Sequence, residues 1–327
     1  MKNLLITGGC GFIGTNYIHY LFEETNFDGN VINVDKLTYA GKKENLFNIQ
    51  TTYPDRYTFF HMDVCDKIMM NYIFRNYDID TVVHFCAESH VDNSIESPNE
   101  FINTNIVGTF NLLELSRAKG IDLFYAVSTD EVFGSIKEGS FTETSRYNPS
   151  NPYSASKASS DHLVHAYYKT FDLPIMISNC TNNYGPFQYR EKLIPLIIYN
   201  AIKNKPLPIY GNGTNIRDWL YVKDHCRAIW SIMNKGKLGE YYNISGNNEL
   251  SNIDIVWKIC DTIDELGLFT ESRRDLITFV KDRPGHDFRY SLNSEKLRKE
   301  LSWYPSEDID GGIRRTVLWY IDEWLGK

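Results

Sequence analysis

Thr7-Gly8-Gly9-Cys10-Gly11-Phe12-Ile13-Gly14 connects an apolar run at the start of the chain to a segment with helical periodicity. Its glycines at positions 8, 11 and 14 have the spacing GxxGxxG. In such a loop the first glycine allows a sharp turn, the second lets the backbone approach a pyrophosphate, and the third lets the helix pack closely on the sheet. The helix N-terminus then offers N–H groups and partial positive charge to phosphates. The stretch therefore predicts a dinucleotide-binding loop.

Strand and helix patterns alternate from this loop through the first half of the chain. The alternation predicts an α/β fold with a doubly wound parallel sheet, the NAD-binding Rossmann fold, whose faces are both covered by helices. The expected strands are Asn3–Thr7, Asn30–Val34, Tyr57–Met62, Thr81–Phe85, Leu123–Ser128 and Ile175–Asn179. The expected helices are Ile13–Glu24, Ile68–Tyr77, Phe101–Arg117 and Tyr153–Thr170.

The pattern loosens after Asn179, where prolines and glycines cluster and short strands mix with helices. We therefore expect residues 1–180 to form the cofactor domain and residues 181–327 to form a second, smaller α/β lobe for the substrate. The helix and strand patterns within 216–245 are expected to rejoin the main sheet.

Composition excludes several classes of function. The chain has 327 residues, enough for two modest domains, and a formal net charge of -8. Nucleic acids and anionic membranes bind basic faces, so neither is an expected partner. The six cysteines are scattered without zinc-type spacing, which predicts free thiols and no metal site. The apolar runs are too short to span a membrane. A strand is expected to begin at Lys2, which leaves no room for a signal peptide. Both observations favour a cytoplasmic location.

Acidic residues at two strand ends extend the predicted cofactor site. Asp35 ends the second strand about 20 residues after the glycine loop, as in dinucleotide-binding units. A carboxylate there accepts hydrogen bonds from both ribose hydroxyls and repels a 2′-phosphate, so the sequence favours NAD over NADP. Asp63-Val64, at the end of the third strand, are expected beside the adenine.

A tyrosine and a lysine four residues apart supply the first catalytic pattern. Asn151 and Pro152 are expected to start a helix, as N-cap and first helical residue, so that Tyr153 and Lys157 project from one face. An unperturbed tyrosine has a pKa of about 10. A neighbouring ammonium, with the positive nicotinamide ring, is expected to lower that pKa, so that Tyr153 can take a proton from a sugar hydroxyl. In this context the pair resembles the extended short-chain dehydrogenase/reductase family.

Two adjacent acids, Asp130-Glu131, follow Ser128-Thr129 at the end of the fifth strand. Ligands of open α/β sheets bind at such strand ends. Oxidation of a hexose at carbon 4 acidifies the proton on carbon 5, which a carboxylate can remove. An acid must then protonate the hydroxyl that leaves carbon 6. Neighbouring carboxyl groups repel, so one can stay protonated while the other ionises.

Several longer motifs make the resemblance specific, and they cover essentially the whole chain. The chain resembles the dTDP-glucose 4,6-dehydratase family in STDEVFG, NPYSASKASSDHLV, CAESHVD, NNYGP, EKLIP, IRDWLYVKDH and DRPGHDFRY. The resemblance implies an NAD-dependent hydro-lyase of rhamnose-type pathways, in which Asp130 is the acid at carbon 6 and Glu131 the base at carbon 5. Thr129 would hydrogen-bond the sugar near carbon 4, Tyr153 would be the base for the oxidation, and Lys157 would also bind the nicotinamide ribose.

The resemblance and the loop pattern together give a full set of expected contacts. The cofactor contacts are Gly8, Gly11, Phe12, Ile13, Gly14, Asp35, Lys36, Asp63, Val64, Ala87, Ser89, Tyr153 and Lys157. The substrate contacts are Ser89, His90, Thr129, Asn182, Lys192, Leu193, Arg217, Asn243, Arg283, His286 and Tyr290. The family pattern also implies a homodimer through the helices of residues 101–117 and 153–170.

Three questions stay open at this stage. The substrate is dTDP-glucose or UDP-glucose, whose bases differ by one methyl group that a pocket discriminates by only about 1–3 kcal/mol. Arg190 and Phe288 depart from the family pattern in the expected substrate lobe. The alternative functions are a nucleotide-sugar 4-epimerase or decarboxylase of the same fold, against which Asp130-Glu131 speak, and a catalytically silent NAD-binding sensor.

Overall fold

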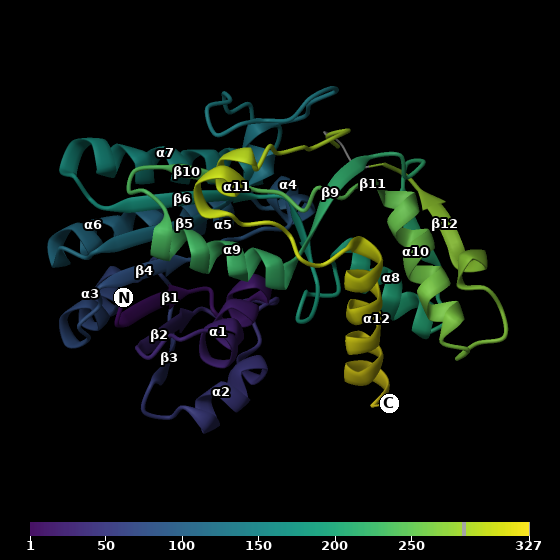
Figure 1. Cartoon of the computed structure of the whole chain (residues 1–327), viewed down its shortest axis with the longest axis horizontal. Helices are drawn as coiled ribbons and strands as arrows, with labels where there is room; N and C mark the ends of the chain where they lie inside the picture. Colours follow the sequence, from purple (N-terminus) through teal and green to yellow (C-terminus); the bar gives the residue numbers. More distant parts are fainter. Residues whose placement is uncertain (283–285, 327) are drawn as a thin grey trace.

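A parallel sheet forms the centre of the larger lobe (Figure 1). The computed structural model describes residues 1–282 and 286–326, and within them this sheet has seven strands in the order β10-β6-β5-β4-β1-β2-β3. The strands are β1 (Asn3–Thr7), β2 (Asn30–Asp35), β3 (Tyr57–His61), β4 (Thr81–His84), β5 (Leu123–Thr129), β6 (Ile175–Cys180) and β10 (Tyr241–Ile244). The six strands expected in the first half are confirmed to within one residue at each end. The predicted doubly wound parallel sheet is therefore confirmed.

Helices cover both faces of this sheet and bury a separate hydrophobic core on each (Figure 1). One face carries α1 (Phe12–Glu24) and α9 (Val222–Lys235), which pack against each other. The other carries α3 (Lys67–Asn76), α6 (Thr109–Lys119) and α7 (Pro152–Phe171). β4, β5 and β6 are buried at every residue, as expected for strands covered on both sides.

The helix expected over 101–117 is built differently. The chain runs through α5 (Pro98–Phe101), a π-helical segment η2 (Ile102–Gly108) and then α6. Asn105, inside η2, donates to the carbonyl of Glu88 at 3.0 Å and accepts from the Glu88 N–H at 2.9 Å. Widened helical turns of this kind commonly occur beside functional sites. Here the widened turn holds the segment that follows β4.

A second lobe lies beside the carboxyl ends of the main strands (Figure 1). It has its own hydrophobic core under two small sheets and three longer helices. The sheets are β11 (Glu249–Ser251), β9 (Ile216–Tyr221) and β7 (Asn182–Tyr184), and β12 (Ile277–Val280) with β8 (Leu207–Tyr210). The helices are α8 (Leu193–Ile202), α10 (Asn252–Glu265) and α12 (Ile309–Leu325). After β9 the chain crosses back through α9 to β10, which pairs with β6 of the main sheet.

Short elements complete the described chain. They are η1 (Lys43–Leu46), α2 (Phe47–Thr52), α4 (Val91–Glu96), η3 (Asp130–Phe133), η4 (Arg273–Leu276) and α11 (Glu295–Leu301). In the main sheet β1 pairs with β2 on one side and with β4 on the other, so successive connections leave β1 in opposite directions. Such a switch point opens a crevice at the carboxyl ends of the strands, where ligands of this architecture bind.

Candidate active site

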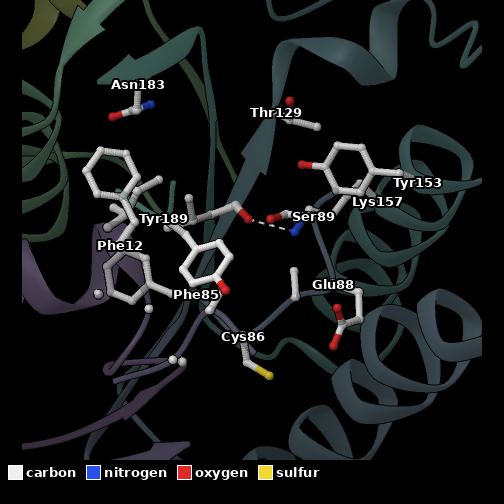
Figure 2. Close-up of a pocket in the computed structure, with 18 of the residues that line it drawn as sticks. Phe12, Phe85, Cys86, Glu88, Ser89, Thr129, Tyr153, Lys157, Asn183 and Tyr189 are labelled. Carbon is white, nitrogen blue, oxygen red and sulfur yellow. Dashed lines mark hydrogen bonds between the residues drawn. The ribbon is translucent and has the colours of Figure 1, made fainter. Parts of the chain in front are cut away.

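A cavity of about 300 Å³ opens at the carboxyl ends of β1, β4, β5 and β6. Residues from the glycine loop, from the ends of these strands and from α7 line it. The second lobe adds Thr181, Asn182, Asn183, Gln188, Tyr189, Glu191 and Lys192. Figure 2 shows Tyr153 and Lys157 on one side of this space and Phe12 on the other. Of the residues expected at the site, it brings together Gly8, Gly11, Phe12, Ile13, Gly14, Asp35, Lys36, Asp63, Ala87, Ser89, Thr129, Asp130, Glu131, Tyr153, Lys157, Asn182 and Lys192.

The glycine loop is shaped by close backbone contacts. Gly8 has a φ of +73°, and a Cβ there would lie 2.6 Å from the backbone nitrogen of Cys86. A Cβ on Gly14 would lie 2.3 Å from the carbonyl oxygen of Gly8. Gly11 is the N-cap of α1 and has no side-chain cap, so the first-turn N–H groups remain for an anionic ligand. The loop therefore has the form that a pyrophosphate requires.

Asp35 ends β2 at the rim of the cavity. Its carboxylate accepts from the N–H of Cys10 at 2.9 Å and from the N–H of Leu37 at 2.8 Å. Burial raises the pKa of Asp35, while these two N–H groups lower it. Beyond it, Lys36 and Asp63 form a 2.8 Å ion pair. The side chain of Val64, the other expected adenine contact, packs in the hydrophobic core and does not line the cavity.

Tyr153 and Lys157 lie on the first two turns of α7. Asn151 caps this helix by accepting from the Ser154 N–H at 2.9 Å, and Pro152 takes the first helical position, as the sequence predicts. Both catalytic candidates are almost fully buried, with exposed fractions of 8% for Tyr153 and 6% for Lys157. The phenol points into the cavity in Figure 2. The Lys157 ammonium donates to the carbonyl of Val127 at 2.8 Å.

The pKa of Tyr153 depends most strongly on burial. Burial raises it well above 10, the negative charge of Glu131 raises it further, and a hydrogen bond with Thr129 lowers it. The expected lowering combines Lys157 with the positive nicotinamide ring and stays a prediction, while among the protein's own groups burial is the largest influence on this pKa. Burial also lowers the pKa of Lys157. The ability of Tyr153 to act as a base therefore depends on whether the groups around Lys157 keep it charged.

The adjacent acids Asp130 and Glu131 lie in different environments, as a dehydration requires of its acid and its base. Asp130 is 3% exposed, its Oδ1 accepts from the Thr129 hydroxyl at 3.2 Å, and its Oδ2 has no hydrogen-bond partner among the described residues. Burial raises the pKa of Asp130 well above 3.8, and the neighbouring charge of Glu131 raises it further. Asp130 therefore holds a proton under conditions in which an exposed carboxyl group is ionised. Glu131 is half-buried and faces Tyr153 and Tyr290, raising the pKa of each.

The segment after β4 meets the second lobe across the cavity. Lys192 donates to the carbonyl of Ser89 at 3.0 Å, which joins the two lobes. His90 lies outside the cavity lining, with its Nε2 3.9 Å from the Glu191 carboxylate. Leu193 starts α8 and packs against the core of the second lobe.

The remaining substrate candidates lie in and around the second lobe, away from the cavity lining. Arg217 is 4% exposed, donates to the carbonyls of Ile216, Asp287 and Phe288, and stacks on Tyr290. Asn243 lies on β10 and donates to the carbonyl of Phe141. His286 contacts Asp282 at 2.7 Å, and Tyr290 donates to Asp287 at 2.7 Å. Arg283 lies outside the described residues.

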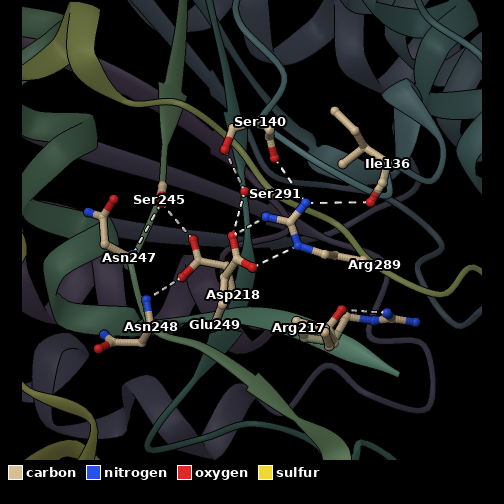
Figure 3. Close-up of polar contacts among 12 residues, drawn as sticks. Ile136, Ser140, Arg217, Asp218, Ser245, Asn247, Asn248, Glu249, Arg289 and Ser291 are labelled. Atoms are coloured by element: carbon tan, nitrogen blue, oxygen red, sulfur yellow. Dashed lines mark hydrogen bonds and ion pairs between the residues drawn. The ribbon is translucent and has the colours of Figure 1, made fainter. Parts of the chain in front are cut away.

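A polar network supports this part of the second lobe (Figure 3). The Arg289 guanidinium and the Glu249 carboxylate form two hydrogen bonds of 2.7 Å, and Arg289 also donates to the Gly139 carbonyl at 2.9 Å. Asp218 accepts from the hydroxyl of Ser245 and from the N–H of Asn248, both at 2.7 Å. The network therefore ties the loop that follows η3 to the second lobe.

Some cavity residues were not singled out from the sequence. Glu191 lines the cavity and accepts from the Tyr39 hydroxyl at 3.0 Å, and Glu88 lines it with a pKa raised by burial. Gln188 and Tyr189 complete the wall on the side of the second lobe. Glu191 lies within the EKLIP motif, and Glu88 follows the fourth strand within CAESHVD. Both motifs were visible in the sequence, but their spacing assigns no chemistry to either residue.

Other classes of site receive no support from the part of the chain that is described. All six cysteines are free. No group of three or more His, Cys, Asp or Glu side chains in residues 1–282 and 286–326 could hold a metal ion. No helix among those residues is both long and apolar enough to cross a membrane.

Comparisons with known proteins agree with this geometry. The family model of GDP-mannose 4,6 dehydratase matches residues 5–316. The chain is 51% identical to dTDP-glucose 4,6-dehydratase of Salmonella typhimurium, over 99% of this chain and 94% of the relative. The crystal structure of DesIV, a dTDP-glucose 4,6-dehydratase from Streptomyces venezuelae with NAD bound, superposes with a TM-score of 0.93 at 40% identity, over 99% of this chain and 98% of that one. A UDP-glucose 4-epimerase from Thermotoga maritima is 26% identical, with a TM-score of 0.88 over 98% and 99% of the two chains. The chain therefore belongs to the family of nucleotide-sugar 4,6-dehydratases that includes the dTDP-glucose 4,6-dehydratases.

Proposed function

We propose that this chain is an NAD-dependent dTDP-glucose 4,6-dehydratase, a hydro-lyase that forms a 4-keto-6-deoxyglucose nucleotide for deoxysugar biosynthesis. One observation carries the proposal: Asp130 and Glu131 stand beside the Tyr153 phenol at the end of β5 and line the same cavity as the glycine loop. A 4-epimerase needs the phenol but has no use for a protonated acid beside a second carboxylate. The relatives named as dTDP-glucose 4,6-dehydratases support the thymidine nucleotide over the uridine one.

The residues present suit NAD. Close backbone packing at Gly8 and Gly14 leaves a flat loop for the pyrophosphate, and the carboxylate of Asp35 lies where it can accept from a ribose. Phe12 and Ile13 would offer N–H groups to the phosphates, and Lys36, Asp63 and the backbone of Val64 would surround the adenosine. Ala87, Ser89, Tyr153 and Lys157 would hold the nicotinamide end. Bound NAD supplies a hydride acceptor for carbon 4 and a hydride donor for carbon 6.

The chain's own residues move the protons. Tyr153 takes the proton from the hydroxyl on carbon 4, with Thr129 hydrogen-bonded to the same phenol and the Lys157 charge favouring the phenolate. Glu131 then removes the proton on carbon 5, which the new ketone has acidified. Asp130 gives its proton to the hydroxyl leaving carbon 6, so that water departs. Glu131 returns a proton to carbon 5 at the end, and the proton gained by Tyr153 balances the one that Asp130 gave to the departing water.

The second lobe is proposed to bind the nucleotide. We assign residues 1–180, with the returning segment 216–245, to the cofactor domain and the rest of 181–327 to the substrate domain. Ser89, His90, Asn182, Lys192 and Leu193 would lie along the sugar and phosphates. Arg217, Asn243, Arg283, His286 and Tyr290 would surround the nucleotide. Three of the five N–H donors of Arg217 are bonded to carbonyls, which fixes the guanidinium against the Tyr290 ring. We also propose a cytoplasmic setting, which six free cysteines support.

An isotope experiment tests the proposed function. With dTDP-glucose labelled by deuterium on carbon 4, the label is expected on carbon 6 of the same product molecule, because one bound NAD accepts and returns it. Product analysis by NMR then separates the alternatives. An epimer would retain its 6-hydroxyl, a decarboxylase would leave this hexose unchanged, and a silent sensor would bind NAD without turnover. Any of these results, or release of the label to solvent, would contradict the proposal.

We further propose a homodimer through the helices that carry residues 101–117 and 153–170. Large apolar side chains are exposed on them, at 45% for Ile102, 41% for Val107, 41% for Phe110 and 44% for Phe171. Such a patch on two adjacent helices suits a self-complementary interface. The Phe110→Glu variant is expected to shift the protein from dimer to monomer in light scattering, because burying a carboxylate there is costly. Phe47→Glu, on α2 with 64% exposure, is the control and should remain dimeric. A monomeric wild type would overturn the assignment.

A further inference from the structure

Asp161 is a buried carboxylate that the proton transfers above do not use. It lies on α7, four residues after Lys157, and is 1% exposed. Its Oδ2 accepts from the Ser128 hydroxyl at 2.6 Å and from the Tyr147 hydroxyl at 3.0 Å. A buried ionised carboxylate is stable only where donors and a cation compensate for lost hydration. Two hydroxyl donors and one nearby ammonium supply part of that compensation here, and burial still raises the pKa of Asp161.

The donors to Asp161 come from the segments that carry the acid pair. Ser128 directly precedes Thr129 on β5. The Tyr147 ring packs edge-on against Phe133 of η3, with ring centroids 5.0 Å apart. One carboxylate therefore joins α7, which bears Tyr153 and Lys157, to both ends of the segment that bears Asp130 and Glu131. A shift of either element would break one of its hydrogen bonds.

Burial raises the pKa of Asp161, while the Lys157 charge and the hydrogen bonds from Ser128 and Tyr147 lower it. Burial lowers the pKa of Lys157, and the Asp161 charge is the largest influence that raises it. The other neighbours of Lys157 stay neutral: burial raises the pKa of Cys180 to about 12 and raises that of Cys86, and burial with the Lys157 charge lowers the pKa of His84 to about 3. The remaining groups facing Asp161 are His162, Tyr147 and Tyr241, and burial raises the pKa of both tyrosines.

We propose that Asp161 is a positioning residue that keeps Lys157 in its cationic form and holds the phenol-bearing helix in register with the acid pair. The charge of Lys157 in turn favours the phenolate of Tyr153. The role rests on the proposed dehydratase function, since it acts through the base for the oxidation. Asp161 itself is separated from the cavity lining and does not touch the reacting atoms.

The pH profile of Asp161→Asn tests the proposal. The Asp161 charge raises the pKa of Lys157, so its removal lets Lys157 lose its proton at lower pH. The alkaline limb of the kcat profile of the NAD-bound enzyme is therefore expected to move down by about one to two pH units, the size expected for charges one helical turn apart. Asp161→Glu keeps the charge and should return the limb toward its wild-type position. A uniform loss of rate with an unmoved limb would mean a merely structural role and would overturn the proposal.

Two further measurements separate the possible failures. In Lys157→Arg the side chain cannot lose its proton near the assay range, so adding Asp161→Asn should not move the limb. The Cε resonance of Lys157 in lysine-labelled, NAD-bound wild type, assigned with Lys157→Met, should report an ammonium at pH values of about 8. This NMR measurement needs neither a folded Asp161 variant nor turnover. It therefore tests the charge of Lys157 even if dTDP-glucose is not a substrate. A neutral Lys157 there would refute the proposal.

Discussion

Tyr153→Phe is expected to lower the turnover of dTDP-glucose by about 10²–10⁴-fold, the usual contribution of a positioned base. The variant keeps the ring that fills the space beside Phe101, with centroids 6.3 Å apart, and loses only the hydroxyl. Without that hydroxyl the proposed base for the carbon 4 proton is missing. The block therefore falls before the oxidation, and no reduced cofactor should accumulate when substrate is mixed with NAD-bound enzyme.

The measurement is a single turnover followed by the absorbance of the reduced cofactor and by product NMR. Tyr168→Phe is the matched control, because Tyr168 lies on the same helix, is half-buried and does not line the cavity. The rate and NAD content of Tyr168→Phe should equal those of the wild type, and the rate of Tyr153→Phe is expressed per bound NAD. Turnover of Tyr153→Phe at the control rate would remove the phenol from the mechanism.

Local sequence patterns predict much of the fold and the residues at the centre of the site. Each strand of the first half is a short apolar run between turns. The structure of the glycine loop, of the strand end at Asp35 and of the helix start at Asn151-Pro152 depends on residues that are close in sequence. Parallel strands then bring their carboxyl ends to one edge of the sheet. Topology therefore places Thr129, Asp130 and Glu131 near the glycine loop once the alternation of strands and helices is recognised.

The parts that the sequence did not predict depend on burial and long-range packing. The sequence does not show that the chain around Asp287 folds back onto Arg217 and accepts hydrogen bonds from its guanidinium. Val64 follows a strand end, yet its side chain turns into the core beside Gly108. The pKa of Tyr153 is set by desolvation, which spacing along a helix does not report. The role of Asp161 likewise needs Ser128 and Tyr147, which reach it from other segments.

Glu131→Gln is expected to slow product formation by about 10²–10⁴-fold, by a block at a later step than in Tyr153→Phe. The amide is nearly isosteric but cannot remove the proton on carbon 5. Oxidation at carbon 4 still proceeds, so reduced cofactor should accumulate in a single turnover. Loss of the Glu131 charge lowers the pKa of Asp130, yet burial is the larger cause of the raised value and keeps Asp130 protonated.

Asp130→Asn separates the roles of the two acids. It retains Glu131 as base, so the carbon 5 proton of bound substrate should exchange with deuterated solvent while water is lost slowly from carbon 6. Glu131→Gln should show neither exchange nor rapid loss of water. The exposed Glu138→Gln, in the loop that follows η3, is the control for a change of charge nearby and should behave as the wild type. Exchange in Glu131→Gln with none in Asp130→Asn would reverse the assignment of base and acid, because only the group that removes the carbon 5 proton can catalyse its exchange.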